Sequence, residues 1–324
     1  MIHIVNPMWN AFGGSEQRVG MLYSTLRARG AVDVWSELAP DRRWTAKIPV
    51  RRIDANQQPL GGTLVVVGVY FRLGPWLATA HPRRVILVVN TLTPGVHAVA
   101  LDLAARTGRK VEIVYASEAL RVKVGLPGHV EPSPIDTRRF TRPRRPRGEA
   151  SFVVGRLSRD VPEKHDPVED PKLYAELVRQ GCTVRIMGGT HLSKLGCPPE
   201  VELLREGVRD AADFLHDLDC FVYRTHPAWF ETFGRVIVEA MAAGLPVVAH
   251  ASGGYLAMVR HGETGLVFRT TDEAVRHILR LRDEVGLAAQ LGDAAMREVE
   301  RTYGQGYWER LTDFYFGEHA APAP

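Results

Sequence analysis

Two glutamates, Glu231 and Glu239, stand on either side of an expected helix start in the stretch WFETFGRVIVEAMAAGLPVVA. The helix runs from about Gly234 to Ala243, and apolar strands are expected before it, at 220–224, and after it, at 245–250. The helix start therefore lies at the carboxyl edge of a parallel sheet, where ligands bind. Unpaired N–H groups at a helix start favour an anion such as phosphate.

Glu239 lies roughly 7 Å further along the helix axis than Glu231. Two acceptors at that separation, beside an anion site, suit the hydroxyls on the two sides of the diphosphate in a nucleoside diphosphate sugar. The alternative for Glu239 is an ordinary solvent-facing glutamate. Its apolar neighbours, Val236 to Val238 and Ala240 to Met241, leave little polar face and favour the ligand interpretation.

Other ligand and cofactor motifs are missing. The sequence has no G-x-x-x-x-G-K-[ST] and no G-x-G-x-x-G, which excludes a P-loop and a dinucleotide fingerprint. Asp217-Leu218-Asp219 resembles a metal-binding D-x-D, but it precedes a strand, and we interpret it as a turn. The histidines show no metal-ligand grouping. We therefore expect no metal and no cofactor.

The composition is that of a globular enzyme, with 45% hydrophobic and 24% charged residues in a chain of 324. No run approaches the about 20 apolar residues that span a bilayer, and the first residues do not form a signal peptide. Three cysteines without metal spacing predict reduced thiols in a cytoplasmic protein. The net charge is +4, with six arginines inside TRRFTRPRRPRG, residues 137–148.

Nucleic acid or an anionic lipid surface are possible partners for this arginine run. A solvated, proline-stiffened connector is the interpretation that we favour. Phe140 is the single aromatic residue among these arginines, too few for a base-stacking surface, so we expect no nucleic acid partner. Contact with a membrane is expected to be peripheral at most, and the oligomeric state is left open.

Short β-rich runs alternate with amphipathic helical stretches, which predicts an α/β protein with parallel sheets. The Pro-, Gly- and Arg-rich stretch 126–148 interrupts this pattern and divides the chain. Strands are expected at 2–6, 32–36, 63–69, 85–89, 111–116, 151–157, 182–189, 220–224 and 245–250. Helices are expected at 13–30, 72–80, 95–107, 171–180, 234–243, 272–300 and 305–316.

Five motifs carry a resemblance to a known family. The segment ETFGRVIVEAMAAGLPVVA resembles the E-x7-E motif of retaining glycosyltransferases with the GT-B fold, in particular glycosyltransferase family 4. The other similar segments, in the family's order, are GGSEQ (13–17), YASEALR with VEPSPIDTRRF (115–140), FVVGRLSRDVPEK (152–164) and SGGYLAMVRHGETGLVF (252–268).

The resemblance implies two Rossmann-like α/β domains whose parallel sheets face each other across a cleft. Residues 1–131 would form the acceptor-binding domain and 132–148 the linker. Residues 149–303 would bind the nucleotide sugar, and 304–324 would form a C-terminal helix, crossing back to the first domain, and a tail.

The resemblance also implies roles for individual residues. Arg156 and Lys164 would bind the donor diphosphate, which suits the bidentate grip of Arg and the compact charge of Lys. Glu239 would accept hydrogen bonds from the ribose, and Glu231 from the transferred sugar. The remaining donor-site residues would be Gly14 from the first domain, Thr232, Phe233 and Gly234 in the cradle, and Met187, Gly188, Gly189 and Val208 at the base.

The sequence departs from the family pattern at several positions. Arg156 and Lys164 are further apart than in many relatives, so Arg159 is a possible substitute for Lys164. Many relatives end a strand of the first domain with histidine, where this chain has Asn90, and His97 follows. RTHPAWF replaces a more usual Pro-Ser, which makes Arg224 and His226 candidate sugar or acceptor contacts.

Together these features predict a retaining hexosyltransferase that uses a nucleotide diphosphate sugar and a hydroxyl acceptor, without metal, in glycan, glycoconjugate or natural-product biosynthesis. Arg156, Lys164 and Glu231 are the candidate catalytic residues. Two alternatives remain: a sugar-nucleotide epimerase of the same fold, and a non-catalytic protein that binds a sugar nucleotide or a polyanion.

Overall fold

The computed structural model describes residues 1–142 and 151–317. The chain forms two compact units. The first contains Met1–Ile135 together with Tyr303–Pro324, and the second contains Asp136–Thr302. The first unit thus extends to Ile135 rather than to residue 131, and the expected linker 132–148 is shared between the units. Part of that linker and the tail after 317 lie outside the described residues.

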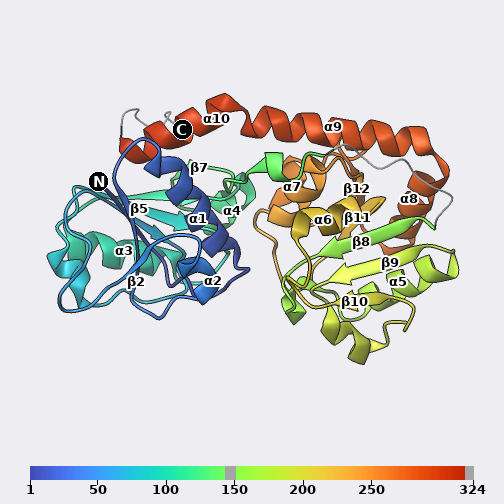
Figure 1. The fold of residues 1–324 in the computed structure, drawn as a ribbon, viewed down its shortest axis with the longest axis horizontal. Helices are drawn as coiled ribbons and strands as arrows, with labels where there is room; N and C mark the ends of the chain where they lie inside the picture. Colours follow the sequence, from blue (N-terminus) through green and yellow to red (C-terminus); the bar gives the residue numbers. More distant parts are fainter. Residues whose placement is uncertain (143–150, 318–324) are drawn as a thin grey trace. The chain divides into compact units, whose positions relative to one another are not determined.

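The first unit contains a seven-stranded parallel sheet in the order β3-β2-β1-β4-β5-β6-β7 (Figure 1). Two of its central strands, TLVVV at 63–67 and RVILVV at 84–89, are nearly continuous apolar runs, as expected where helices cover both faces of a parallel sheet. Their bounds are β1 (Ile2–Val5), β2 (Val32–Ser36), β3 (Val50–Arg52), β4 (Thr63–Val67), β5 (Arg84–Val89), β6 (Val111–Tyr115) and β7 (His129–Val130).

The helices of this unit are α1 (Gly14–Arg27), α2 (Arg42–Thr45), α3 (Val96–Thr107), α4 (Glu118–Val124) and α10 (Gln305–Phe316), with the 3₁₀ helix η1 (Pro75–Thr79). Helix α10 packs on α1 although almost the whole second unit separates them in sequence. Arg84 donates a hydrogen bond to the Phe314 carbonyl, and Phe314 stacks on His129 with 4.8 Å between ring centroids. These contacts make α10 part of the first unit.

The second unit contains a six-stranded parallel sheet in the order β10-β9-β8-β11-β12-β13. Its strands are β8 (Val153–Leu157), β9 (Thr183–Met187), β10 (Glu202–Leu204), β11 (Cys220–Tyr223), β12 (Val247–His250) and β13 (Leu266–Phe268). The helices are α5 (Glu169–Arg179), α6 (Ala211–His216), α7 (Arg235–Ala242), α8 (Thr271–Asp283) and α9 (Val285–Tyr303), with short 3₁₀ turns η2 (Thr137–Arg139), η3 (Pro162–Lys164), η4 (Thr190–Leu195) and η5 (Gly254–Ala257). Two parallel sheets with helices confirm the predicted α/β class.

Two helix predictions differ from the structure. The expected helix at 72–80 is the five-residue 3₁₀ helix η1, because Gly74 and Pro75 prevent a longer one. The expected helix at 272–300 is broken into α8 and α9 at Glu284, whose ψ of 79° is not helical. A capping box of Thr270 and Glu273 fixes the start of α8. None of the helices within 1–142 and 151–317 is long and apolar enough to cross a membrane.

Candidate functional site

The strand order of the second unit changes direction between β8 and β11. The chain passes from β8 outward to β9 and β10, and then returns to β11 and continues outward to β12 and β13. In open parallel sheets the carboxyl ends of two such strands diverge into loops that form a ligand crevice. The loops that follow β8 and β11 carry Lys164 and Glu231, two of the three predicted catalytic residues.

Lys164 and Glu231 form an ion pair in which the Lys164 Nζ donates to Glu231 Oε2. Each side chain is 12% exposed. The Tyr223 hydroxyl donates to the same oxygen at 2.8 Å, and the Lys164 Nζ lies 5.5 Å from the centroid of the Trp229 ring. The structure therefore brings a cation and an anion together at a nearly buried position.

The carboxyl group of Glu231 is ionised in this setting. Burial by itself would raise the pKa of Glu231, but the charge of Lys164 and the hydrogen bonds from Lys164, Tyr223 and the Gly234 backbone lower that pKa below its ordinary value. Burial and the Glu231 charge raise the pKa of Tyr223, so its hydroxyl stays protonated and donates. The site thus contains an ionised Glu231 carboxylate that is oriented by a hydrogen bond from the Tyr223 hydroxyl.

Arg156 is the most deeply buried of the three predicted catalytic residues. Its side chain is 1% exposed, and its guanidinium donates to the carbonyls of Arg224 at 2.6 Å and Lys164 at 2.5 Å. The guanidinium also lies over the Tyr223 ring, 4.6 Å from the centroid. Arg156 lies beneath the two loops and fixes their backbones, including that of Lys164. In this structure Arg156 positions the two loops, and its contact with phosphate stays a prediction.

Arg224, a predicted sugar or acceptor contact, is also buried. Its Nε donates to Asp170 Oδ1 at 2.9 Å while Nη1 donates to Thr271 Oγ1 at 3.1 Å. Its guanidinium lies over the Phe268 ring, 5.7 Å from the centroid.

Asp170 is the residue that joins this buried network, and the sequence analysis did not select it. Its carboxylate lies within ion-pair distance of Arg156, Arg224 and His165, at 3.4, 2.9 and 3.6 Å. It also accepts a hydrogen bond from the Asp166 N–H. Burial opposes ionisation of Asp170, but its cationic and hydrogen-bonding neighbours lower its pKa overall. The only signal in the sequence was an acidic residue in the first turn of α5, which is a common helix feature.

Helix α7 begins at a glycine that no other residue could replace without strain. Gly234 has φ of 79°, and a Cβ there would lie 2.9 Å from the Tyr255 ring. The Gly254 N–H donates to the Glu231 carbonyl at 2.7 Å, so the segment 252–255 closes over the start of the helix. Thr232 is buried and Phe233 half-buried in the same turn. The start of α7 is thereby held beside the Lys164–Glu231 pair.

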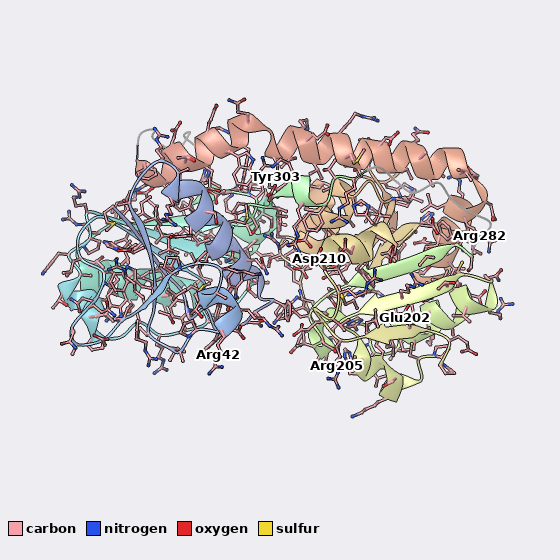
Figure 2. The ribbon with its side chains drawn as sticks, viewed as in Figure 1. Arg42, Glu202, Arg205, Asp210, Arg282 and Tyr303 are labelled. Carbon is pink, nitrogen blue, oxygen red and sulfur yellow. The ribbon has the colours of Figure 1, made fainter. Side chains whose placement is uncertain are left out.

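Glu239 is buried in α7, so it is not a solvent-facing glutamate. Arg235 Nε donates to Glu239 Oε1 at 3.0 Å, one turn earlier on the helix. Burial raises the pKa of Glu239, and the Arg235 charge offsets only part of that effect. Asp210, labelled in Figure 2, and Arg139 also act on this carboxyl electrostatically. The two predicted acids therefore have pKa values shifted in opposite directions.

The base-pocket residues lie at the end of β9. Gly188 has φ of 90° and a Cβ would lie 1.9 Å from the Ser158 carbonyl oxygen, so the loops after β8 and β9 meet there. Met187 is buried, while Val208 is 59% exposed beyond β10. Asp160 fixes the loop after β8 to this region by accepting from the Thr190 N–H at 2.9 Å. Arg159 is half-buried beside it, and Gly189 precedes Thr190.

The remaining candidates are more scattered. His226 is half-buried and its N–H donates to the Glu163 carbonyl, which places it beside the Lys164 loop. Gly14, Asn90 and His97 belong to the first unit: Gly14 begins α1, Asn90 follows β5 and His97 is exposed on α3. Asn90 accepts from Arg18 at 3.0 Å and donates to Ser15 at 3.1 Å, so its amide has a structural role.

The aspartates of the D-x-D sequence and three of the arginines in the basic run have protein partners. Asp219 Oδ2 accepts from the Val153 N–H, and Asp217 pairs with Arg209 at 2.6 Å. Arg138, Arg139 and Arg142 pair with Asp136, Asp210 and Asp213 respectively. The other arginines of the run, at 144, 145 and 147, lie outside the described residues.

Comparison with known proteins identifies the second unit. Residues 153–284 match the family described as glycosyl transferases group 1. The matched segment covers most of the second unit, including Lys164, Glu231 and Glu239. The D-inositol 3-phosphate glycosyltransferase of Salinispora arenicola is 33% identical over 222 residues, which are 57% of this chain and 47% of the relative. The chain thus spans about half the length of that relative.

Two longer similarities agree with this assignment. The GDP-mannose-dependent alpha-(1-6)-phosphatidylinositol monomannoside mannosyltransferase of Mycobacterium tuberculosis is 27% identical over 329 residues, covering 86% of this chain and 83% of the relative. The crystal structure of Anabaena HepE in complex with UDP and glucose superposes with a TM-score of 0.73 at 18% identity, over 98% of both chains. The GT-B fold that the E-x7-E motif implied is confirmed, and the family match extends over residues 153–284.

Proposed function

We propose that this protein is a group 1 glycosyltransferase that moves a hexose-type sugar from a nucleotide diphosphate sugar to an acceptor hydroxyl, with retention and without a metal ion. The observation that carries the proposal is the Lys164–Glu231 pair beside the start of α7, at the β8/β11 switch point. The Anabaena structures hold UDP with glucose and UDP-glucose, which supports this class of donor.

The proposed donor site assigns a role to each predicted residue of the second unit. Lys164 is a nearly buried cation, and the first N–H groups of α7 add positive potential for the diphosphate. Glu231, held ionised, accepts from hydroxyls of the transferred sugar. Glu239 accepts from the ribose. Val208 and the turn Met187–Gly189 would line the base.

The proposed chemistry rests on stabilisation of the leaving diphosphate. Cleavage of the glycosidic bond produces an oxocarbenium-like sugar and places negative charge on the diphosphate. Lys164 and the α7 start are fixed by Arg156 and Gly234 before that charge develops, so little reorganisation is needed. In front-face attack the acceptor oxygen bonds to the anomeric carbon while its proton passes to the leaving phosphate oxygen. Attack by Glu231 is the competing route, and it would leave a glycosyl ester on that residue.

Release of free nucleoside diphosphate tests the proposal. The full chain is incubated with UDP- and GDP-sugars, with and without acceptors, beginning with D-inositol 3-phosphate, the compound in the name of the Salinispora relative. Lys164→Ala is expected to lower turnover about 10²–10³-fold, as the loss of one charge stabiliser does elsewhere. Chelation of divalent ions is expected to leave turnover unchanged.

Lys172→Ala is the matched control, because Lys172 also pairs with a glutamate but is 62% exposed on α5. It is expected to keep full turnover. Equal turnover of Lys164→Ala and the native chain would reject the role of Lys164. Failure of all nucleoside diphosphates to raise the melting temperature would reject donor binding itself, since a ligand of the native state must stabilise it.

A further inference from the structure

The first unit has a cavity at its own switch point. Its sheet reverses direction between β1 and β4, because the chain passes from β1 outward to β2 and β3 and returns to β4. A cavity of about 230 Å³ opens beside the carboxyl ends of these strands. Its lining comes from 5–7 and Trp9 after β1, Glu37 and Leu38 after β2, and Phe71 and Arg72 after β4. The second unit has its candidate site at the equivalent position.

The loop that forms one wall is held in a strained conformation. Met8, which is fully buried, has φ of 51°, a value that residues other than glycine rarely adopt. Asn6 enforces this turn: its side-chain oxygen accepts from the Met8 N–H at 2.8 Å, while its Nδ2 donates to the Val67 carbonyl at 2.8 Å and the Tyr70 hydroxyl at 2.9 Å. Strain of this kind is retained mainly where a structure over-determines it, as at binding sites.

The turn delivers an aromatic side chain to the cavity and leaves it open to solvent. Trp9 is 48% exposed, which is unusual for tryptophan. Tyr70 supports it from behind, with ring centroids 5.9 Å apart, and Tyr70 in turn contacts Phe71 at 5.6 Å. Burial and the charge of Glu16 raise the pKa of Tyr70 to about 12, so this support stays neutral. Trp9 and Phe71 thus both line the cavity, and both rings contact the ring of Tyr70.

Glu37 supplies one oriented polar group. Its Oε1 accepts from the Gly74 N–H at 2.8 Å and the Trp76 Nε1 at 2.5 Å, and its Oε2 accepts from the same Gly74 N–H at 3.0 Å. A carboxylate has about four acceptor positions. The carboxylate is therefore fixed by protein donors and retains capacity on Oε2 for a hydroxyl of a ligand.

We propose that this cavity binds the ring of a cyclic polyol, a sugar or an inositol, as the acceptor. An aromatic face is electron-rich, so it attracts the C–H face of such a ring, while a ring hydroxyl donates to Glu37. The volume is below the about 300–1,000 Å³ of pockets for drug-sized ligands and suits a single ring. The acceptor role depends on the proposed transferase function, whereas ring binding by itself does not.

Saturation-transfer NMR on the full chain tests this site with three probes: myo-inositol, D-inositol 3-phosphate and methyl α-D-mannopyranoside. We expect transfer to the ring C–H protons of at least one probe, and about tenfold weaker binding to Trp9→Ala. Trp9→Phe should restore most of the binding because it keeps an aromatic face. Leu60→Ala is the control, since Leu60 is an exposed apolar residue of the same unit, 61% exposed, outside the cavity lining.

The melting-temperature rise caused by UDP and GDP is measured on the same variants. Nucleotide stabilisation without polyol binding would overturn this inference and leave the donor site intact. Polyol binding that depends on Trp9, without nucleotide stabilisation, would support the cavity and reject the transferase proposal. Polyol binding that Trp9→Ala leaves unchanged would place the ligand elsewhere and overturn the inference.

Discussion

Each unit buries an arginine beneath the carboxyl ends of its strands, and the two arginines fix different things. Arg18 in α1 pairs with Glu131 at 2.5 Å, and the Tyr315 hydroxyl of α10 donates to the same carboxylate. Arg156 pairs with Asp170, which also serves Arg224. The Arg18–Glu131 pair helps to hold α10 on the first unit. Arg156 holds the loops after β8 and β11, because it donates to the carbonyls of Lys164 and Arg224. In both units the buried arginine thus connects segments that are distant in sequence.

The largest expected effect is that of Asp170→Ala. This change leaves two buried guanidinium groups without their carboxylate, and loss of one member of a buried ion pair costs about 3–5 kcal/mol. The free energy of unfolding, from urea titration, should fall by at least that range. Asp102→Ala is the control, because its pair with Arg106 is exposed and contributes about 0–1 kcal/mol. If Asp170→Ala lowered the free energy of unfolding no more than Asp102→Ala, the buried Asp170 network would contribute no more stability than a surface ion pair.

Glu131→Gln should have a smaller effect. The amide oxygen can still accept from Arg18, so the expected loss is about 1–3 kcal/mol, the cost of weakening charged hydrogen bonds. Hydrogen exchange of α10 should accelerate, because its Tyr315 contact is weakened. Stabilisation by UDP or GDP should not change. Loss of nucleotide binding in this variant would show that the two buried arginines are not separate in function.

The two glutamates of the second unit should respond oppositely to neutralisation. The pKa of Glu231 is lowered in the folded state, so its ionised form contributes stability above the unfolded pKa of about 4.3, and this contribution is lost as pH falls through the folded pKa. The pKa of Glu239 is raised, so its ionised form costs stability at neutral pH. At pH 7, Glu231→Gln should lower the free energy of unfolding by about 1.5–3 kcal/mol, and Glu239→Gln should leave it unchanged or raise it. Equal losses at pH 7, with parallel pH profiles, would contradict these assignments.

Arg142→Gln should have the smallest effect. Its pair with Asp213 is about half exposed on both sides, so the expected change is at most about 1 kcal/mol and should vanish at high salt. Thermal melts at low and high ionic strength provide the measurement. A salt-independent loss of several kcal/mol would show that the described part of the arginine run is more than a solvated surface.

Residue periodicity predicted the two parallel sheets, and the motif resemblance assigned Lys164 and Glu231 to one donor site, where the structure brings the two side chains together. Neither the periodicity nor the resemblance predicted the burial of Arg156 and Arg224, because a sequence does not show that one aspartate, Asp170, lies between them. The short helices and edge strands, such as α4, β3 and β7, were missed because they are too brief to show a period. The cavity beside Trp9 depends on a single strained residue, Met8, which no composition rule identifies.

The assignment of α10 to the first unit has a consequence for how the chain is made. Domains commonly fold in the order of synthesis. Here Leu311, Phe314 and Tyr315 complete the core of the first unit, yet the ribosome adds them after residues 136–302. Residues 136–302 can therefore fold before the first unit is complete, because residues 1–135 still lack α10 at that stage. Until α10 is synthesised and packs, Arg18 and Glu131 lack the contact from Tyr315.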